Sequence, residues 1–140
     1  MTVDEYGMEY LDEAECLELL SGQVLGRLAV SITNHPDIFP INHVVDDGCV
    51  VFKTAEGTKL AAAVLGASVA YEVDGYDPGN GVAWSVVVKG KAVEIEAIED
   101  QLHAEDLPLF PWHISPKRRF VRINPTQITG RRFHVADHPH

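Results

Sequence analysis

Residues 39–60 decide the fold, and from Phe39 to Leu60 they read FPINHVVDDGCVVFKTAEGTKL. Asp47-Gly48 lies between two mostly apolar runs, which is a strong signal for a two-residue turn between antiparallel strands. The second run ends in a polar loop, and a helix is expected to begin at about Thr58. The stretch therefore predicts strand, tight turn, strand, loop and helix, in that order.

The loop after the second strand carries groups that bind phosphate. Thr54, Gly57, Thr58 and Lys59 supply hydroxyls, free N–H groups and one cation where the helix begins. Groups of this kind hold phosphates at helix N-termini. An ordinary helix start, with Lys59 in solvent, also explains the same residues, and helix N-termini are far more common than phosphate sites. The residues alone leave both interpretations open.

The remaining pattern predicts four more strands, at residues 24–33, 68–74, 83–95 and 119–123. Residues 127–133 extend the last strand or form a short seventh. Helices are expected at 11–20, 58–65 and about 98–105, a turn at 34–37 and a loop at 75–81. Pro40 marks an edge or a bulge, and Gly90 a bend. Six antiparallel strands with short helices favour a small, mainly β barrel, because closure removes exposed strand edges.

Composition indicates one globular domain over residues 1–140, with flexible ends at 1–10 and 134–140. The hydrophobic content is 46% and the net charge is −10, which argues against nucleic acid or an anionic membrane as the main partner. No apolar run approaches a membrane span, and the N-terminus lacks the features of a signal peptide. Cys16 and Cys49 have no metal-binding or redox spacing, so a reduced, cytoplasmic protein is expected.

The cations are unevenly distributed. Six of the 11 lie near the C-terminus: Lys117, Arg118, Arg119, Arg122, Arg131 and Arg132. We expect those at 117–122 to pair with acidic residues, within the chain or across a dimer. Exposure to solvent and binding of a substrate phosphate are the alternatives.

An ordered series of short motifs resembles a known family. The series comprises Leu25–Val30 (LGRLAV), Phe39–Asn42 (FPIN), Phe52–Leu60 (FKTAEGTKL), Trp84–Gly90 (WSVVVKG), Phe120–Pro125 (FVRINP) and Ile128–Phe133 (ITGRRF). It is similar to the pyridoxamine 5′-phosphate oxidase-like, FMN-binding split-barrel proteins, in particular the short members common in actinobacteria. The resemblance covers about residues 13–133.

This resemblance implies a six-stranded antiparallel Greek-key split barrel that forms a homodimer, with FMN in two clefts between the subunits. It implies an FMN-dependent oxidoreductase acting on a small-molecule substrate. It assigns the flavin ring to Pro40, Ile41 and Asn42, and the phosphate to Lys53, Thr54, Thr58 and Lys59. Trp84 and Ser85 of the partner subunit would cover the ring, and Arg131 would be a further cofactor contact.

The chain also departs from the family. The full-length oxidases carry a C-terminal Arg-Leu-His-Asp-Arg segment that holds pyridoxal phosphate, and this chain has no counterpart, so that substrate is not expected. The nitroimidazole-resistance relatives have a histidine where this chain has Lys53. A deazaflavin in the same cleft is an alternative. So is a non-catalytic flavin or haem carrier or sensor; for haem, His43 or His113 would be the axial ligand.

Three residues have plain structural explanations as well. Trp84 is more often a core residue than a stacking platform, and Asn42 fits a cap on a bulge beside Pro40 as well as a flavin contact. His43 alternates with Asn42, so the two side chains point to opposite faces, and we expect a core or interface histidine. No side chain is predicted as a general acid or base, and none as a metal ligand.

Overall fold

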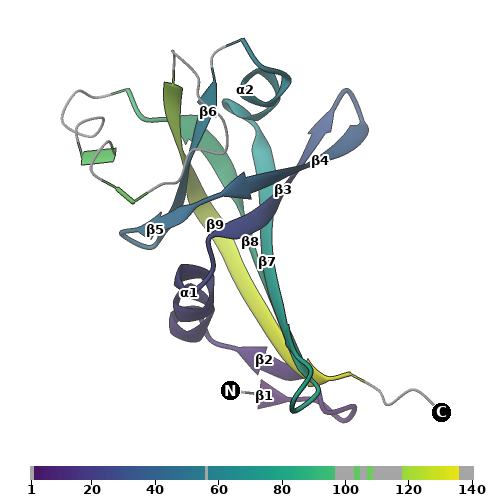
Figure 1. The fold of residues 1–140 in the computed structure, drawn as a ribbon. Helices are drawn as coiled ribbons and strands as arrows, with labels where there is room; N and C mark the ends of the chain where they lie inside the picture. The colour runs from purple at the N-terminus through teal and green to yellow at the C-terminus, as the bar shows by residue number, and fades with distance from the viewer. Residues whose placement is uncertain (1, 56, 97–102, 105–106, 109–117, 136–140) are drawn as a thin grey trace.

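One antiparallel sheet, curled into a barrel, forms most of this computed structural model (Figure 1). The structure describes residues 2–55, 57–96, 103–104, 107–108 and 118–135. Its elements, in chain order, are β1 (Thr2–Val3), β2 (Glu9–Leu11), α1 (Glu13–Ser21), β3 (Leu25–Ile32), β4 (His35–Asn42), β5 (Val44–Asp46), β6 (Cys49–Ala55), α2 (Lys59–Val64), β7 (Ser68–Asp77), β8 (Val82–Glu94) and β9 (Arg118–His134).

The barrel closes because one segment changes partners at His43. β4 pairs with β3, while β5, one residue further along the chain, pairs with β6. The neighbours around the barrel are β4, β3, β7, β8, β9, β6 and β5, all antiparallel. With β4 and β5 taken as one interrupted strand, six strands complete the circuit. The predicted mainly β, six-stranded antiparallel split barrel is therefore confirmed.

Two hairpin turns, the ones between β3 and β4 and between β5 and β6, differ in how well the sequence predicts them. Asp47 and Gly48 form the expected turn, with φ of 49° and 75°. The first turn is not residues 34–37, as predicted, but Thr33 and Asn34, with φ of 50° and 63°. Positive φ at both central residues matches the twist of a two-residue hairpin, so β4 already begins at His35. Among the described strands β4 pairs only with β3, so Pro40 lies on an edge strand, where a missing N–H is tolerated.

The long strands run further than predicted. β7 continues through residues 75–77, which were expected to be a loop, because β8 pairs with them there. Residues 118–134 form the single strand β9, including Pro125. The pairing of β8 with β9 shifts between Lys89 and Gly90, as the predicted bend at Gly90 requires. A side chain at Gly90 would overlap the backbone of Asn124.

Residues expected to be a flexible N-terminal end include the strands β1 and β2, and β2 adds to the edge of β9. The predicted helix near the N-terminus is α1, where the Asp12 carboxylate accepts a hydrogen bond from the Glu15 N–H at 2.9 Å. Gly130 lets this helix approach β9, because a Cβ there would lie 2.5 Å from Cys16 Sγ. The helix predicted near residues 98–105 falls mostly outside the described residues.

The main core fills the barrel. Among its largest fully buried side chains are Leu20, Leu28, Phe52, Tyr71 and Ile123, contributed by α1, β3, β6, β7 and β9. A smaller apolar cluster covers the outer face of β6 and contains Val51, Ile95, Ala104 and Phe120. Neither described helix has the length and apolar character needed to cross a membrane.

Candidate cofactor site

The corner that follows β6 contains a buried hydroxyl without a hydrogen-bond partner. Thr54 is 4% exposed, and its Oγ1 bonds to no atom of the described residues. Thr54 and Arg119 are direct partners across β6 and β9, so their side chains lie on the same face of the sheet. A buried polar atom left unpaired is costly, and such an atom commonly marks a position that a water molecule or a ligand completes.

Thr58 and Lys59 have structural roles of their own. The Thr58 hydroxyl donates to the Ala55 carbonyl at 2.7 Å and accepts from the Ala61 N–H at 3.1 Å, which caps α2. Lys59 Nζ pairs with Asp37 Oδ2 at 3.1 Å and ties α2 to β4, but its side chain is 73% exposed. The Lys59 ammonium therefore remains accessible, whereas the Thr58 hydroxyl is already engaged.

Arg119 joins this corner from β9. It lines a hollow of about 350 Å³ together with Gly57, Thr58, Ala61, Ala62 and Leu65. Its guanidinium also lies 3.5 Å from the Glu94 carboxylate. The sequence pointed to Arg119 only as one member of a basic stretch, since its position beside Thr54 depends on a strand register that no local pattern reveals.

Lys53 lies on the opposite face of β6 from Thr54. Its Nζ is 5.5 Å from the centre of the Phe120 ring, beside the smaller apolar cluster. The structure thus brings Thr54, Thr58 and Lys59 to one corner, which Arg119 also lines. Lys53 points away from this corner, to the other face of β6. Alternation along the strand accounts for this separation.

The predicted ring-contacting residues lie on the edge strand β4. Pro40 pairs with Arg27 and is exposed, while Asn42 pairs with Leu25 and is half-buried. Ile41, between them, is 5% exposed and packs in the main core. Pro40 and Asn42 thus share the outer face, and Ile41 can offer a ligand only its backbone.

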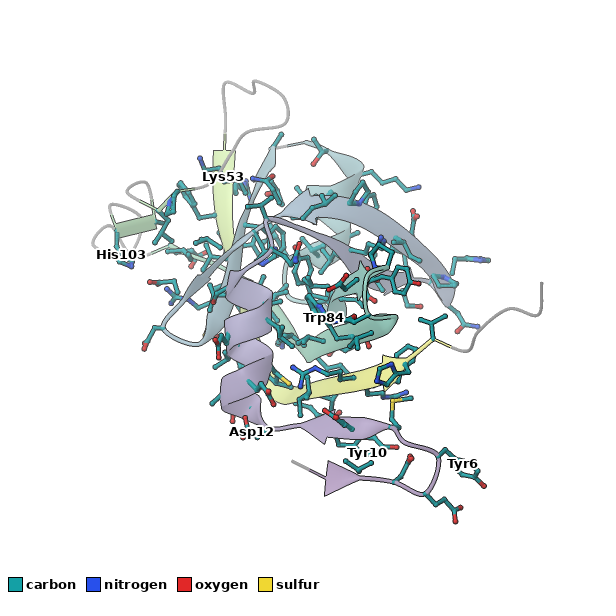
Figure 2. The ribbon with its side chains drawn as sticks, turned by 60° about the horizontal axis from the view of Figure 1, so that its bottom comes forward. Tyr6, Tyr10, Asp12, Lys53, Trp84 and His103 are labelled. Carbon is teal, nitrogen blue, oxygen red and sulfur yellow. The ribbon has the colours of Figure 1, made fainter. Side chains whose placement is uncertain are left out.

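Ser85 and Arg131 lie at the far end of the molecule from this corner. They face each other across β8 and β9, and Arg131 is also paired with Tyr10 of β2. Trp84 packs on the inner face, where its indole lies so close to Gly75 that any side chain at that glycine would overlap it. Figure 1 shows α2 and β6 at one end of the molecule, and Figure 2 shows Lys53 of β6 and Tyr10 of β2 near opposite ends.

The distance between the two ends follows from β9. Arg119 and Arg131 are 12 residues apart on this strand. At about 3.3 Å per residue, the path along the strand is about 40 Å. Within one chain, the α2 corner and the Ser85–Arg131 pair therefore cannot contact the same small cofactor.

His43 is a core histidine, as expected. It is 4% exposed, its Nε2 lies 2.9 Å from the Leu20 carbonyl oxygen, and its Nδ1 lies 2.6 Å from the Tyr71 hydroxyl. Both ring nitrogens are engaged, so His43 is not available as an axial haem ligand in this conformation. His113, the other candidate, lies outside the described residues. Within the described part of the chain, no group of acidic, histidine and cysteine side chains has the arrangement of a metal site.

The basic C-terminal strand pairs with acidic residues, as predicted for residues 117–122. Arg119 contacts Glu94, and Arg122 contacts Asp46, each at 3.5 Å. These pairs lie within one chain. The expectation that the basic stretch is balanced by carboxylates is therefore confirmed for both residues.

Comparison with known proteins places the chain in a family. The family model for pyridoxamine 5′-phosphate oxidase matches residues 12–132. The protein Rv0080 of Mycobacterium tuberculosis is 38% identical over 91% of this chain and 86% of its own length. Among solved structures, the FAD binding protein from Mycobacterium smegmatis is 41% identical, with a TM-score of 0.85 over 91% of this chain and 100% of that one.

A second solved structure, the conserved protein of unknown function DIP1874 from Corynebacterium diphtheriae, is 36% identical, with a TM-score of 0.76 over 91% of this chain and 98% of that one. The family match spans the barrel, the α2 corner and the Ser85–Arg131 end. The chain therefore belongs to the pyridoxamine 5′-phosphate oxidase family.

Proposed function

We propose that this chain is a flavoprotein oxidoreductase that acts on a small molecule and binds FMN between the two subunits of a homodimer. Its family and its similarity to the mycobacterial FAD binding protein support a flavin. The observation that carries the proposal is that Thr54 lies beside one end of the long strand β9, whereas Ser85 and Arg131 lie near its other end. A single cofactor can contact both groups only if they come from different subunits.

The phosphate end of the site is the α2 corner. Thr54 Oγ1 lacks a partner among the described residues, so it has a hydrogen bond to give. Arg119 and the exposed ammonium of Lys59 supply positive charge on two sides of the corner. Because α2 has only six residues, its dipole contributes little, and charge-assisted hydrogen bonds from side chains would provide most of the affinity.

The ring end begins at Pro40 and Asn42 on the outer face of β4. The Asn42 amide suits the polar edge of an isoalloxazine, and Pro40 offers it a flat apolar surface. From the second subunit, Ser85 and Arg131 would complete the site, while Trp84 would hold Ser85 in place from the inner face. A bound flavin would supply the electron-transfer chemistry.

The outer face of the sheet has the features expected of a dimer interface. A hollow of about 590 Å³ runs over β3, β7 and β8, and its floor contains Ala29, Ser31, Ser68 and Ala70. Ile38, beside it on β4, is 62% exposed. Small side chains with exposed apolar neighbours allow close approach of a second sheet, and burial of this face would also cover Pro40 and Ser85.

Titration of the apoprotein with FMN, followed by flavin fluorescence, tests this function. We expect binding at micromolar FMN, and Lys59→Ala to weaken it by about 1–3 kcal/mol, roughly 5- to 150-fold. Asp37→Asn is the matched control, because it breaks the same ion pair but keeps the cation, so binding should be unchanged or tighter. A folded protein that binds neither FMN nor FAD contradicts the proposal, and tighter binding of a deazaflavin would replace FMN with that cofactor.

A further inference from the structure

A chain of three buried contacts connects helix α1 to the edge strand β4. It runs from the Leu20 carbonyl oxygen to His43 Nε2 at 2.9 Å, then from His43 Nδ1 to the Tyr71 hydroxyl at 2.6 Å. The Tyr71 hydroxyl continues to the Ile41 carbonyl oxygen at 2.9 Å. Tyr71 is fully buried, and a side chain at Gly26 would overlap its ring.

The number of protons in this chain depends on the charge of His43. Both ends are carbonyl oxygens, which only accept, so three hydrogen bonds need three protons. A neutral histidine and a neutral tyrosine supply two. With the ring proton on Nε2 for Leu20, the single Tyr71 proton must serve either His43 Nδ1 or Ile41. Protonation of His43 supplies the missing proton and satisfies all three contacts.

Burial works against that protonation. It lowers the pKa of His43 below the ordinary value of 6.5, and the hydrogen bond to Leu20 only partly offsets it. Burial also raises the pKa of Tyr71 far above its usual range, so the tyrosine stays protonated. The ring in the free protein is therefore neutral at pH 7, one proton short of a fully bonded chain.

Within the described residues, no charged side chain contacts His43. On the strands around it, Arg27 pairs with Glu72 and Asp74, and Asp37 pairs with Lys59. On α1, Glu15 pairs with Arg132, and Glu13 and Glu18 are exposed. Asp46 of β5 bonds to His103 and Arg122. The C-terminal end of α1 adds a partial negative charge at Leu20, which favours an imidazolium.

We propose that His43 takes up a proton when a bound ligand places negative charge against Pro40–Asn42, with the Tyr71 hydroxyl turning from His43 to Ile41. This inference rests on the proposed function, because the ligand is a flavin whose ring is anionic when reduced. Ile41, whose carbonyl ends the chain of contacts, lies between the two residues assigned to the ring. The proton comes from solvent, and the imidazolium balances the added negative charge. His43 is thus a positioning and charge-compensating residue.

Anaerobic calorimetry measures this proton directly. Binding of reduced FMN in buffers with different ionisation enthalpies gives the number of protons taken up, and oxidised FMN gives the reference with an uncharged ring. We expect reduced FMN to add uptake of up to one proton per site over oxidised FMN. His43→Gln, which keeps hydrogen-bonding capacity but cannot carry the proton, should abolish this difference. His35→Gln, at an exposed histidine of β4, should preserve it.

Nitrogen NMR of labelled histidine provides a second readout that does not depend on activity. We expect His43 to carry a proton on Nε2 alone in the free protein at pH 7, and on both nitrogens with reduced FMN bound. Tyr71→Phe should suppress the change, because Nδ1–H would then lack an acceptor. Binding with an unchanged His43 ring overturns this inference alone. Absence of any flavin binding by the folded protein overturns it together with the proposed function.

Discussion

The Thr54 hydroxyl has no hydrogen-bond partner among the described residues, which favours a role in ligand binding over a structural one. Most buried hydroxyls have a protein partner, and loss of that partner costs stability. Thr54 has none within the described part of the chain, so a water molecule or a ligand is needed to satisfy its hydroxyl. A bound phosphate that accepts a hydrogen bond from this hydroxyl would explain why a threonine is present at this position.

Thr54→Val tests this explanation because valine keeps the shape and removes the hydroxyl. We expect unchanged or higher stability in urea, by up to about 1 kcal/mol, because no protein hydrogen bond is lost. FMN affinity should fall roughly 5- to 10-fold, and Thr54→Ser should restore most of it. A valine variant that is destabilised by more than about 2 kcal/mol would show instead that the hydroxyl has a structural partner.

His43 predicts a pH dependence of stability. Its pKa is lower in the folded protein than the ordinary 6.5, so below that pH the unfolded chain binds more protons. The free energy of unfolding therefore contains a contribution from neutral His43. This contribution is complete above about pH 6.5, and it is lost as the pH falls from that value towards the pKa of His43 in the folded protein. Urea unfolding of the free protein should give a free energy of unfolding that falls from about pH 7.5 to about pH 5. His43→Gln should make this fall smaller. Identical profiles for the two proteins would contradict a neutral, buried His43.

For single residues, the sequence predicts which side chains are buried better than it predicts which side chains contact each other. Alternation along the predicted strand placed His43 opposite Asn42, and the structure confirms a core histidine. Nothing in the sequence indicates that Tyr71, 28 residues later, supplies its hydrogen bond. Lys53 and Thr54, which the resemblance assigned together to the phosphate, lie on opposite faces of β6 because side chains alternate along a strand.

At the scale of the elements, the paired strands β8 and β9 determine the length of the molecule. Their close approach depends on one glycine. Gly90 sits where the register shifts, and its Cα faces the Asn124 backbone without room for a side chain. Gly90→Ala should therefore cost about 1–3 kcal/mol or more, because backbone cannot move aside as a flexible side chain does. Gly22→Ala is the control, since the nearest atom to its Cβ would be 3.5 Å away. Equal urea midpoints for the two variants would contradict the close approach.

Strong local signals predicted most elements. The Asp47-Gly48 turn, the capped helix α1 and the apolar runs of β3 and β6 all matched the structure. Two of the errors occurred where a partner strand overrides local composition. Residues 75–77 read as a loop but extend β7 because β8 pairs with them, and β2 forms because β9 offers it an edge.

At the scale of the whole molecule, each proposed flavin site requires residues from two chains. The ordered motifs were sufficient to predict the family and the barrel, but not where the candidate site residues lie along it. That information comes from the pairing of β6, β8 and β9, which puts Arg119 and Arg131 about 40 Å apart along one strand. Light scattering should accordingly give the mass of a dimer, and titration with FMN should give two flavins per dimer.

Complementation between two inactive variants tests this central claim most directly. Lys59→Glu disrupts the phosphate end and Arg131→Glu the far end, both at exposed side chains, and each homodimer should bind FMN weakly. Refolding the two together should form mixed dimers in which one site carries both defects and the other none. Random pairing makes half of the dimers mixed, so a quarter of all sites should bind FMN with wild-type affinity. A mixture that binds no better than the separate variants would contradict a site shared between subunits.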